Sequence, residues 1–404
     1  MRILFVAARL PYPPLSGDQV RAFHQLRLLG RQHEITLLSF TRGKPSPEAI
    51  SRLAPFCRRI VTVPHHGIRR WIGCLRGRLS SYPIQTLFHQ SRQMSRAVQT
   101  ELSARAFDLV HVQLVRMAPY FEAMSDVPRV IDLIDALSLN MERRHQRQRG
   151  LLKLAVRVER DRLSAYERAV CSMYDRAAVV SSLDQAAIGD FPNLHTVPNG
   201  VDLGQFAFRR GERHDHVIMF GGNMGYFPNV DAVKWFVREV FPLIRRRVPT
   251  AQFQIVGVNP HRDVRQLANL DPAVTVTGYV KDMHARLNES VVAVVPLRCG
   301  SGMQSKVVEA MASGTPLVVT SFALGGIDAL DGHHLLIANQ PQAFASHVIR
   351  LLKQGDLRDT LAANARRLVE QRYTWERSTQ MLEQIYSLAL AAHSPQKAVV
   401  RRAA

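Results

Sequence analysis

Short apolar runs of strand length alternate with helical stretches along almost the whole chain. In the first half, the runs are Ile3–Ala8, Ile35–Phe40, Ile60–Val63, Leu109–Gln113, Val130–Asp135 and Ala177–Ser182. Helical spacing marks the segments Asp18–Leu29, Pro47–Phe56, Gln90–Ala106 and Leu137–Tyr174. Strands that are apolar throughout and alternate with helices predict an α/β fold, in which a parallel sheet is covered on both faces.

The same alternation resumes after a break at Val197-Pro198-Asn199-Gly200-Val201-Asp202, where Pro and Asn-Gly interrupt regular structure. Strands are expected at Val217–Gly221, Phe253–Gly257, Val274–Thr277, Val291–Val295, Leu317–Thr320 and Leu335–Ala338. Closing helices are expected at Gln342–Lys353, Leu357–Gln371 and Glu376–Ala391. A chain of 404 residues is too long for one core. We therefore predict two doubly wound, Rossmann-like domains, 1–200 and 201–374, with the ligand in the cleft between them.

The charge balance is strongly basic. Lys and Arg number 53 against 33 acids, which gives a net charge of +20, and residues 50–99 hold nine arginines and no acid. Within that span, residues 69–78 interleave Arg with Trp71, Ile72 and Leu75. This pattern favours an anionic membrane surface as a partner. A solvated basic surface is the plainer interpretation. Nucleic acid is not expected, because aromatic residues make up only 7% of the chain and no recognition motif occurs.

Other classes of protein are disfavoured by what the sequence lacks. No run approaches the roughly 18 to 20 apolar residues of a membrane span. The start, Met1–Ala8, is typical of a first buried strand and not of a signal peptide. The four cysteines show no metal-ligand spacing and are expected to be reduced thiols. We expect a cytoplasmic protein, peripheral on the inner face of the cell membrane, with no metal and no cofactor.

One segment predicts a binding site directly. The apolar run Val291–Pro296 ends in the loop Gly300-Ser301-Gly302, and a helix then carries Lys306 and Glu309 before it stops at Gly314. The first N–H groups of a helix and its dipole favour an anion. Glu309, two turns into the expected helix, can accept hydrogen bonds from sugar hydroxyls, and Lys306 can add a charge for phosphate. Together they suit a nucleotide-sugar.

This segment resembles the donor-site signature of the family-4 retaining glycosyltransferases, which have the GT-B fold. The family usually shows two glutamates separated by seven residues. Here Glu309 occupies the second position and Ser301 the first. Some bacterial members, from exopolysaccharide clusters, instead show Gly-x-Gly-x-x-x-Lys-x-x-Glu-Ala-Met, as this chain does. The resemblance implies retention of configuration without a metal. It places the donor against Gly300, Ser301, Gly302, Met303 and Gln304. We expect the helix to start at Gly302–Gln304, where it would stabilise the charge of the departing diphosphate.

The resemblance extends to two more loops and to the end of the chain. After the expected strand Val217–Gly221, the family carries a phosphate-binding Arg and then a Lys, where this chain has Gly222-Asn223 and the Pro228 region. We predict that Lys306 replaces those charges. The loop Thr277–Asp282 resembles the base-binding loop, with Val280 reading the base through its backbone. A helix at 375–393 is expected to pack back on the first domain, followed by a basic tail, 394–404.

In the first half, Gly17 and Asp18 begin a predicted helix, and the resemblance places a glycine there that faces the donor phosphate. Asp18 has capping of the helix as its alternative role. Arg21 faces either the cleft or water. His111 lies inside a strand and is expected to be a core histidine satisfied by the backbone.

The expected fifth strand of this half contains two acids, Asp132 and Asp135. A buried carboxylate is costly unless it is paired, so at least one of the two is expected to face the cleft. We favour Asp135, at the carboxyl end of the strand, as the residue that holds sugar or acceptor hydroxyls.

These observations predict a glycosyltransferase that moves a sugar from a UDP- or GDP-sugar to a hydroxyl acceptor. The expected acceptor is a lipid-linked or growing exopolysaccharide glycan. One alternative is a nucleotide-sugar epimerase of GT-B-like fold, which would need a cluster of acidic residues in the cleft. The other is a basic nucleic-acid-binding protein.

Overall fold

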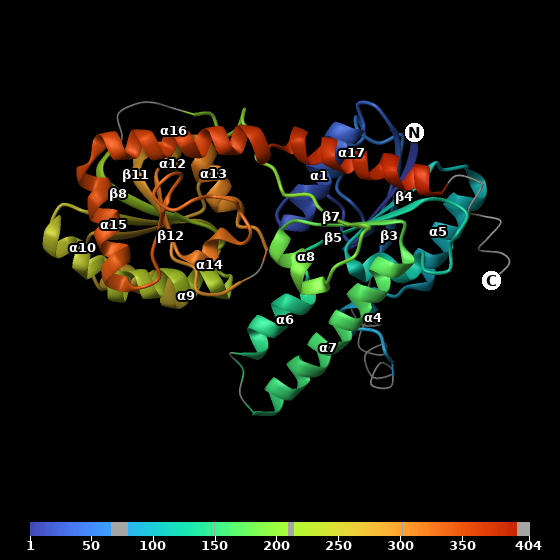
Figure 1. Cartoon of the computed structure of the whole chain (residues 1–404), viewed down its shortest axis with the longest axis horizontal. Coiled ribbons are helices and arrows are strands. Elements are labelled where there is room, and N and C mark those ends of the chain that lie inside the picture. The colour runs from blue at the N-terminus through green and yellow to red at the C-terminus, as the bar shows by residue number, and fades with distance from the viewer. Residues whose placement is uncertain (66–79, 147, 149, 209–213, 301, 394–404) are drawn as a thin grey trace. The chain divides into compact units, whose positions relative to one another are not determined.

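The computed structural model describes residues 1–65, 80–146, 148, 150–208, 214–300 and 302–393 (Figure 1). It divides into two compact units. Unit 1 comprises Met1–Pro198 and the chain from Ser378 onward, and unit 2 comprises Asn199–Arg377. Three features of the sequence lie outside the described residues: the basic segment 69–78, Ser301 and the tail 394–404.

Unit 1 is built on a parallel sheet of seven strands in the order β3-β2-β1-β4-β5-β6-β7. The strands are β1 (Arg2–Ala7), β2 (Glu34–Thr41), β3 (Arg59–Pro64), β4 (Leu109–Gln113), β5 (Arg129–Ile134), β6 (Arg176–Val179) and β7 (Leu194–Thr196). The helices are α1 (Gly17–Leu29), α2 (Pro47–Leu53), α4 (Ile84–Leu87), α5 (Arg92–Ala104), the 3-10 helix η2 (Val115–Tyr120), α6 (Leu137–His145), α7 (Gly150–Met173), α8 (Ser182–Ile188) and most of α17 (Trp375–Ala392). The strand order reverses between β1 and β4.

Unit 2 repeats this plan with six parallel strands in the order β10-β9-β8-β11-β12-β13. The strands are β8 (His214–Gly221), β9 (Gln252–Val256), β10 (Val274–Gly278), β11 (Ser290–Val295), β12 (Leu317–Val319) and β13 (Leu336–Ile337). The helices are α9 (Phe227–Trp235), the π-helix η3 (Phe236–Val240), α10 (Phe241–Arg247), α11 (Arg262–Arg265), the 3-10 helix η4 (Gln266–Asn269), α12 (Met283–Glu289), α13 (Ser305–Ser313), α14 (Ser321–Leu324), α15 (Pro341–Lys353) and α16 (Gly355–Arg372). The prediction of two doubly wound, Rossmann-like α/β domains is confirmed.

The cores explain why these strands form where the apolar runs predicted them. In β1 every residue from Ile3 to Ala7 is fully buried, and every residue of β11 is buried. A strand that is covered on both faces keeps apolar side chains at successive positions. Local signals set the helix starts, as at α2, where Ser46 accepts a hydrogen bond from the Ala49 amide at 3.1 Å and Pro47 follows.

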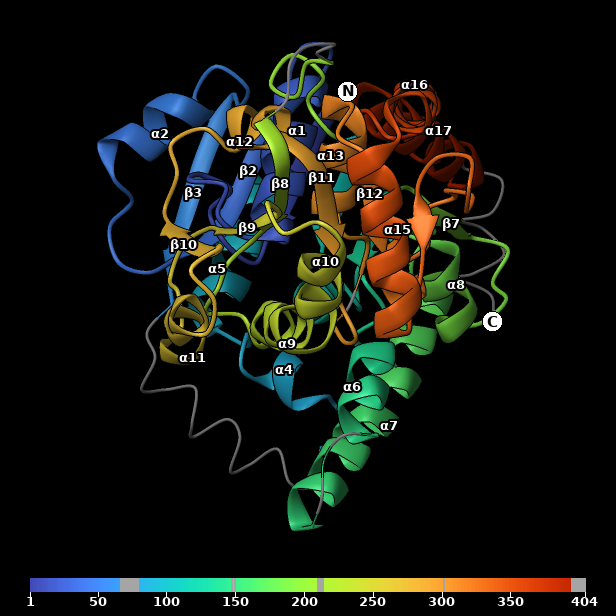
Figure 2. The same cartoon turned by 90° about the vertical axis from the view of Figure 1, so that its left-hand side faces the viewer.

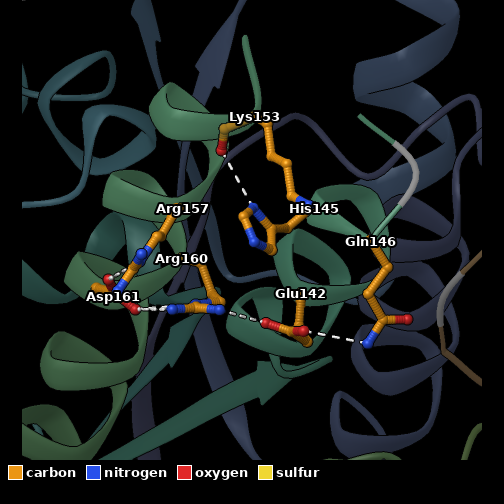
Figure 3. Close-up of polar contacts among 7 residues, drawn as sticks. All are labelled: Glu142, His145, Gln146, Lys153, Arg157, Arg160 and Asp161. Atoms are coloured by element: carbon orange, nitrogen blue, oxygen red, sulfur yellow. Dashed lines mark hydrogen bonds and ion pairs between the residues drawn. The ribbon is translucent and has the colours of Figure 1, made fainter. Parts of the chain in front are cut away.

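The segment Leu137–Tyr174, marked by helical spacing, is helical but is not one helix. The segment forms two helices, α6 and α7, that lie side by side and project from the sheet of unit 1 (Figures 1 and 2). Gly150 has a φ of +61°, which a right-handed helix cannot continue through. Polar contacts then join the two helices (Figure 3). Arg160 donates to Glu142 at 2.6 Å, and the His145 ring lies 3.1 Å from the Lys153 carbonyl oxygen.

Arg21 faces neither a cleft nor water, contrary to both expectations. It is fully buried and donates to Asp132, which is also fully buried, at 2.6 Å. Gln25 donates to the same Asp132 oxygen at 3.0 Å. Burial pushes the pKa of Asp132 up, but the charge and hydrogen bond of Arg21 outweigh it, so that the pKa lies below its ordinary value. This pair ties α1 to β5 in the core.

His111 is a core histidine, as expected, but its partner is a side chain and not the backbone. Its ring stacks on Phe5 at 4.3 Å, and its Nδ1 lies 2.8 Å from the hydroxyl of Tyr386. Tyr386 comes from α17, whose Leu382, Ile385 and Ala389 join the same core cluster as Ile3 and Phe5. The last helix is therefore part of the core of unit 1.

This histidine predicts a pH dependence of stability. Burial lowers the pKa of His111 to about 4, so the folded protein resists a proton that the unfolded chain accepts near pH 6.5. The stability that the neutral His111 side chain contributes to the folded state is complete above pH 6.5 and is lost as the pH falls toward 4. We expect Tyr386→Phe, which keeps His111, to lose about 2 kcal/mol more between pH 7 and pH 5 than the double variant His111→Phe/Tyr386→Phe. Urea unfolding at the two pH values measures this, and equal losses in the two variants would contradict it.

Candidate functional site

The sheet of unit 2 has its switch point between β8 and β11. Strands β9 and β10 follow on one side of this pair, and β12 and β13 follow on the other. Ligands of doubly wound sheets bind at the carboxyl ends of the strands at such a point. Those ends are Gly221 and Val295, and the loops that follow them are the two glycine loops that the sequence singled out.

The first loop brings a lysine and an asparagine against bare backbone. A Cβ placed on Gly222 would lie 2.8 Å from the Asn229 Nδ2 and 3.2 Å from the Lys306 Nζ. Glycine is therefore needed for this close approach. Asn229, in the first turn of α9, donates to the Asn223 carbonyl oxygen at 2.9 Å. Asn223 itself accepts from the Gly225 amide at 3.0 Å, so its side chain closes the turn of the loop.

Lys306 lies at the centre of this arrangement. Its Nζ donates to the Asn229 Oδ1 at 2.6 Å and lies 4.8 Å from the centroid of the Phe220 ring. Burial lowers the pKa of Lys306 to about 8, although the charge of Glu309 opposes the shift. Gly222, Asn223 and Lys306, predicted from separate motifs, are thus brought together.

Glu309 lies closer to the start of its helix than expected. Helix α13 begins at Ser305 with Gln304 as its N-cap, so Glu309 is just over one turn in, and not two. Burial raises the pKa of Glu309, while a hydrogen bond from Ser305 and the charge of Lys306 oppose this. Glu309 and Lys306 line one cavity of about 90 Å³, at the carboxyl end of β8 and beside β11. Its other lining residues are Met219, Gly221, Gly222, Met283, Leu287, Ala293, Val294 and Val295.

The expectation that Gly302–Gln304 begins the helix is wrong. Gly302 has a φ of +65°, which a right-handed helix does not adopt, and these residues form a loop that precedes α13. Gln304 donates to the Gly302 carbonyl oxygen at 3.2 Å. Gly300, Gly302, Met303 and Gln304 do not line the cavity of Glu309. Because α13 begins at Ser305, the first backbone N–H groups of this helix are those of Ser305 and Lys306, and not those of Gly302–Gln304.

Val280 follows β10 and is partly buried against the core of unit 2. It does not line the cavity, but Met283, three residues later, does. Sequence reasoning missed Met283, together with Phe220 and Asn229, the partners of Lys306. The only signal for Asn229 was its place in the segment that opens α9.

The remaining predicted residues, Gly17, Asp18 and Asp135, belong to unit 1. Gly17 begins α1 with open space around it, because an added Cβ would meet no atom within 4 Å. Asp18 is not the cap of this helix, since Ser16 holds the N-cap position. It accepts from the Ser16 hydroxyl at 2.6 Å and faces Arg9 at 3.5 Å.

The two acids of β5 and its following loop have separate environments. Asp132 is enclosed with Arg21, whereas Asp135 is only partly buried. Burial, and next the negative charge of Asp184, raise the pKa of Asp135 to about 7. A carboxyl group with such a pKa can exchange a proton near neutral pH.

Within the described ranges, no three His, Cys, Asp or Glu side chains are grouped so that they could hold a metal ion. In the same part of the chain, no helix is long and apolar enough to cross a membrane.

Comparison with known proteins agrees with this geometry. Residues 215–354 match the family model of the glycosyl transferases group 1. An uncharacterized 44.6 kDa protein of the cps region of Klebsiella pneumoniae is 22% identical over 178 residues, which are 42% of this chain and 45% of that protein. The D-inositol 3-phosphate glycosyltransferase of Salinispora arenicola is 36% identical over 241 residues, which are 51% of this chain and 52% of that enzyme. The chain thus spans about half the length of these curated relatives.

Solved structures that resemble almost the whole chain include a synthase and a second protein solved with ligands. The sucrose-phosphate synthase of Thermosynechococcus elongatus superposes with a TM-score of 0.72 at 17% identity, over 97% of this chain and 100% of that one. Anabaena HepE, solved with UDP and glucose, gives a TM-score of 0.65 at 15% identity, over 96% and 99% of the two chains. The chain has the GT-B fold, and residues 215–354 are similar to the glycosyl transferases group 1.

Proposed function

We propose that the protein is a glycosyltransferase that moves a sugar from a nucleotide diphosphate donor, UDP- or GDP-linked, to a hydroxyl acceptor. The observation that carries the proposal is the arrangement at the switch point of unit 2. Lys306 lies against the backbone of Gly222, and Glu309 lines the same cavity. A cation beside bare backbone suits a diphosphate, and a carboxylate one turn further along suits sugar hydroxyls. The resemblance of the fold to HepE, which was solved with UDP, supports a nucleotide donor.

In this proposal, the leaving diphosphate lies against the Gly222 loop and the first turn of α13. The bond between the sugar C1 and the diphosphate oxygen breaks, and a bond from C1 to the acceptor oxygen forms on the same face, with retention. The acceptor proton passes to the leaving diphosphate oxygen, so no protein nucleophile and no metal are required. Lys306 stabilises the charge that develops on the leaving group. Glu309 orients the sugar.

The rival epimerase would need several acids around the sugar. The cavity beside α13 is lined by a single carboxylate, that of Glu309, among its described residues. This favours transfer. For the acceptor, we propose a lipid-linked or growing exopolysaccharide glycan at an anionic membrane surface. The relative from a cps region and the net charge of +20 support it.

The role of Glu309 predicts a specific loss. Glu309→Gln should bind free UDP or GDP as the parent does, but should lose at least about tenfold in affinity for the matching nucleotide-sugar, because its charged acceptor is gone. Titration calorimetry with UDP, GDP and their hexose derivatives measures this. Glu289→Gln is the control and should bind like the parent, because Glu289 is a partly buried acid on neighbouring α12 that is paired with Arg286 at 3.0 Å. Parent-like sugar binding by Glu309→Gln would remove Glu309 from the site.

The role of Lys306 predicts a pH dependence of donor binding. Because the pKa of Lys306 lies at about 8, its charge is present below pH 8 and is lost above it. Nucleotide diphosphate affinity should therefore fall by about tenfold between pH 7 and pH 9, as one ionic contact is lost. Lys306→Gln should bind weakly at both pH values and show no such fall. The control is Lys234→Gln, which removes a lysine that pairs with Asp263 at 2.6 Å elsewhere in unit 2. This variant should show the same fall in affinity with pH as the parent. The same fall in Lys306→Gln would refute the assignment.

The proposed membrane surface has its own test. The full chain should co-sediment with liposomes that contain phosphatidylglycerol and be released as salt rises, because exposed charges are screened. Liposomes of phosphatidylcholine alone should retain much less protein. Binding that is indifferent to lipid charge would exclude an electrostatic membrane partner.

A further inference from the structure

Unit 1 contains a pocket that the donor site does not use. It has a volume of about 750 Å³ and lies at the carboxyl ends of β1, β2 and β3. Its walls come from the loops after β1 and β2, the end of β2, the residue after β3, the segment of α4 and the two residues after it, and η2. All its lining residues belong to unit 1. The carboxyl ends of parallel strands are where such sheets bind ligands, so the position is that of a ligand site.

The pocket is positively charged. Arg9, Arg42, Lys44 and Arg116 line it, and its described lining includes no Asp or Glu. Arg42 and Lys44 are exposed, whereas Arg116 is partly buried. Asp18 lies near Arg9, at 3.5 Å, but outside the lining. Four cations around one pocket repel each other, and a bound anion would relieve this repulsion.

Arg116 adds a more specific indication. Its Nη2 donates to the Gln85 side-chain oxygen at 2.7 Å, which fixes the guanidinium in the wall. Its Nε is buried and has no hydrogen-bond partner among the described residues. Burial, and next the charge of Arg9, lower the pKa of Arg116. A buried guanidinium N–H without an acceptor is costly, and an anionic oxygen would satisfy it.

Beside the cationic side chains, the wall of the pocket contains aromatic and imidazole rings. The rings of His65 and His89 stack at 5.3 Å, and Phe40 packs against both, at 4.4 and 6.3 Å. Leu15, at the rim, is 83% exposed. The pocket therefore offers an anion site next to an aromatic and apolar wall, a combination that suits an ester of phosphate with a larger organic group.

We propose that this pocket binds the acceptor through a phosphate or diphosphate group, and that Arg42, Lys44 and Arg116 are the residues that hold it. The inference rests on the proposed function, because an acceptor exists only for a transferase. A diphosphate balances more of the four charges than a carboxylate does, and arginine forks match phosphate oxygens. The acceptor is thus a phosphate ester whose sugar hydroxyl receives the transferred sugar.

The experiment measures probe binding to the full chain in saturating UDP, so that the donor site is filled. Two pairs of probes separate the sources of the phosphate: geranyl diphosphate with geraniol, and glucose 6-phosphate with glucose. We expect the phosphorylated member of at least one pair to bind at least ten times more tightly than its partner. Binding of the first pair identifies a lipid phosphate, and binding of the second identifies a sugar phosphate.

The variants then locate the site. Arg42→Gln/Lys44→Gln changes two exposed side chains and should weaken the phosphorylated probe at least tenfold, as should Arg116→Gln. Arg246→Gln/Arg247→Gln removes the same two charges from the exposed end of α10 in unit 2 and should leave probe binding unchanged. UDP affinity should be the same in all of these proteins.

Three results would overturn the inference. The first is equal affinity for the two members of both probe pairs. The second is an equal loss of probe affinity in Arg42→Gln/Lys44→Gln and in Arg246→Gln/Arg247→Gln, and the third is glucuronate binding as tightly as glucose 6-phosphate. Failure of the proposed function looks different. In that case UDP and GDP themselves would not bind, whatever the phosphate probes do. If the nucleotides bind and Glu309→Gln behaves as expected while the phosphorylated probes do not bind, only the present inference fails.

Discussion

The contact on which the candidate site depends is the one between the Lys306 ammonium and the Asn229 amide, 2.6 Å apart. It joins the first turn of α13 to the first turn of α9, and both lie against the Gly222 backbone. A cation removed from water but held by a neutral amide and a ring is only partly compensated. Under the proposed function, a diphosphate bound here would gain more from Lys306 than it would from a solvated lysine, because the dielectric around Lys306 is low.

The buried pair in unit 1 shows the opposite arrangement. Arg21 is enclosed with a carboxylate, Asp132, which also accepts from Gln25 and from the Ile134 amide. Here the charges compensate each other inside the core, so the pair fixes α1 against β5 and has little to offer a ligand. Three residues after Asp132, the partly exposed Asp135 lacks such a cation at hydrogen-bonding distance in the described structure, and burial raises its pKa to about 7. Asp132, inside β5, therefore has a structural role, whereas Asp135, just after β5, is able to exchange a proton with a ligand or solvent.

Most strands could be predicted because they are continuous apolar runs, a pattern that burial on both faces favours. The short strand β7, of three residues, was not predicted. Helix boundaries could be predicted only where a local residue sets them. Gly150 stands at the start of α7, which periodicity had joined to α6, and Gly302 lies in a loop where the start of a helix was expected. Glycine permits left-handed backbone at both positions, which a pattern of apolar residues does not reveal. The partners of the predicted residues could not be predicted. Asn229 meets Lys306 across 77 residues, and Tyr386 meets His111 across 275, and both depend on tertiary packing. The cationic pocket was missed for the same reason, since its four charged residues come from three separate segments of the chain.

Unit 2 is formed by one continuous segment of the chain, whereas unit 1 needs segments from both ends of the sequence. Unit 2 is continuous, but the core of unit 1 contains both Phe5 of the first strand and Tyr386 of the last helix, so it is completed only after unit 2 has been made. The chain passes between the units twice, and the two passages are tied together. Val201 forms a bridge with Thr374 within unit 2, and the Ser378 hydroxyl donates to the Pro198 carbonyl oxygen at 2.7 Å within unit 1. The connection between the units is therefore two segments of chain, joined by contacts within each unit, and not a single linker.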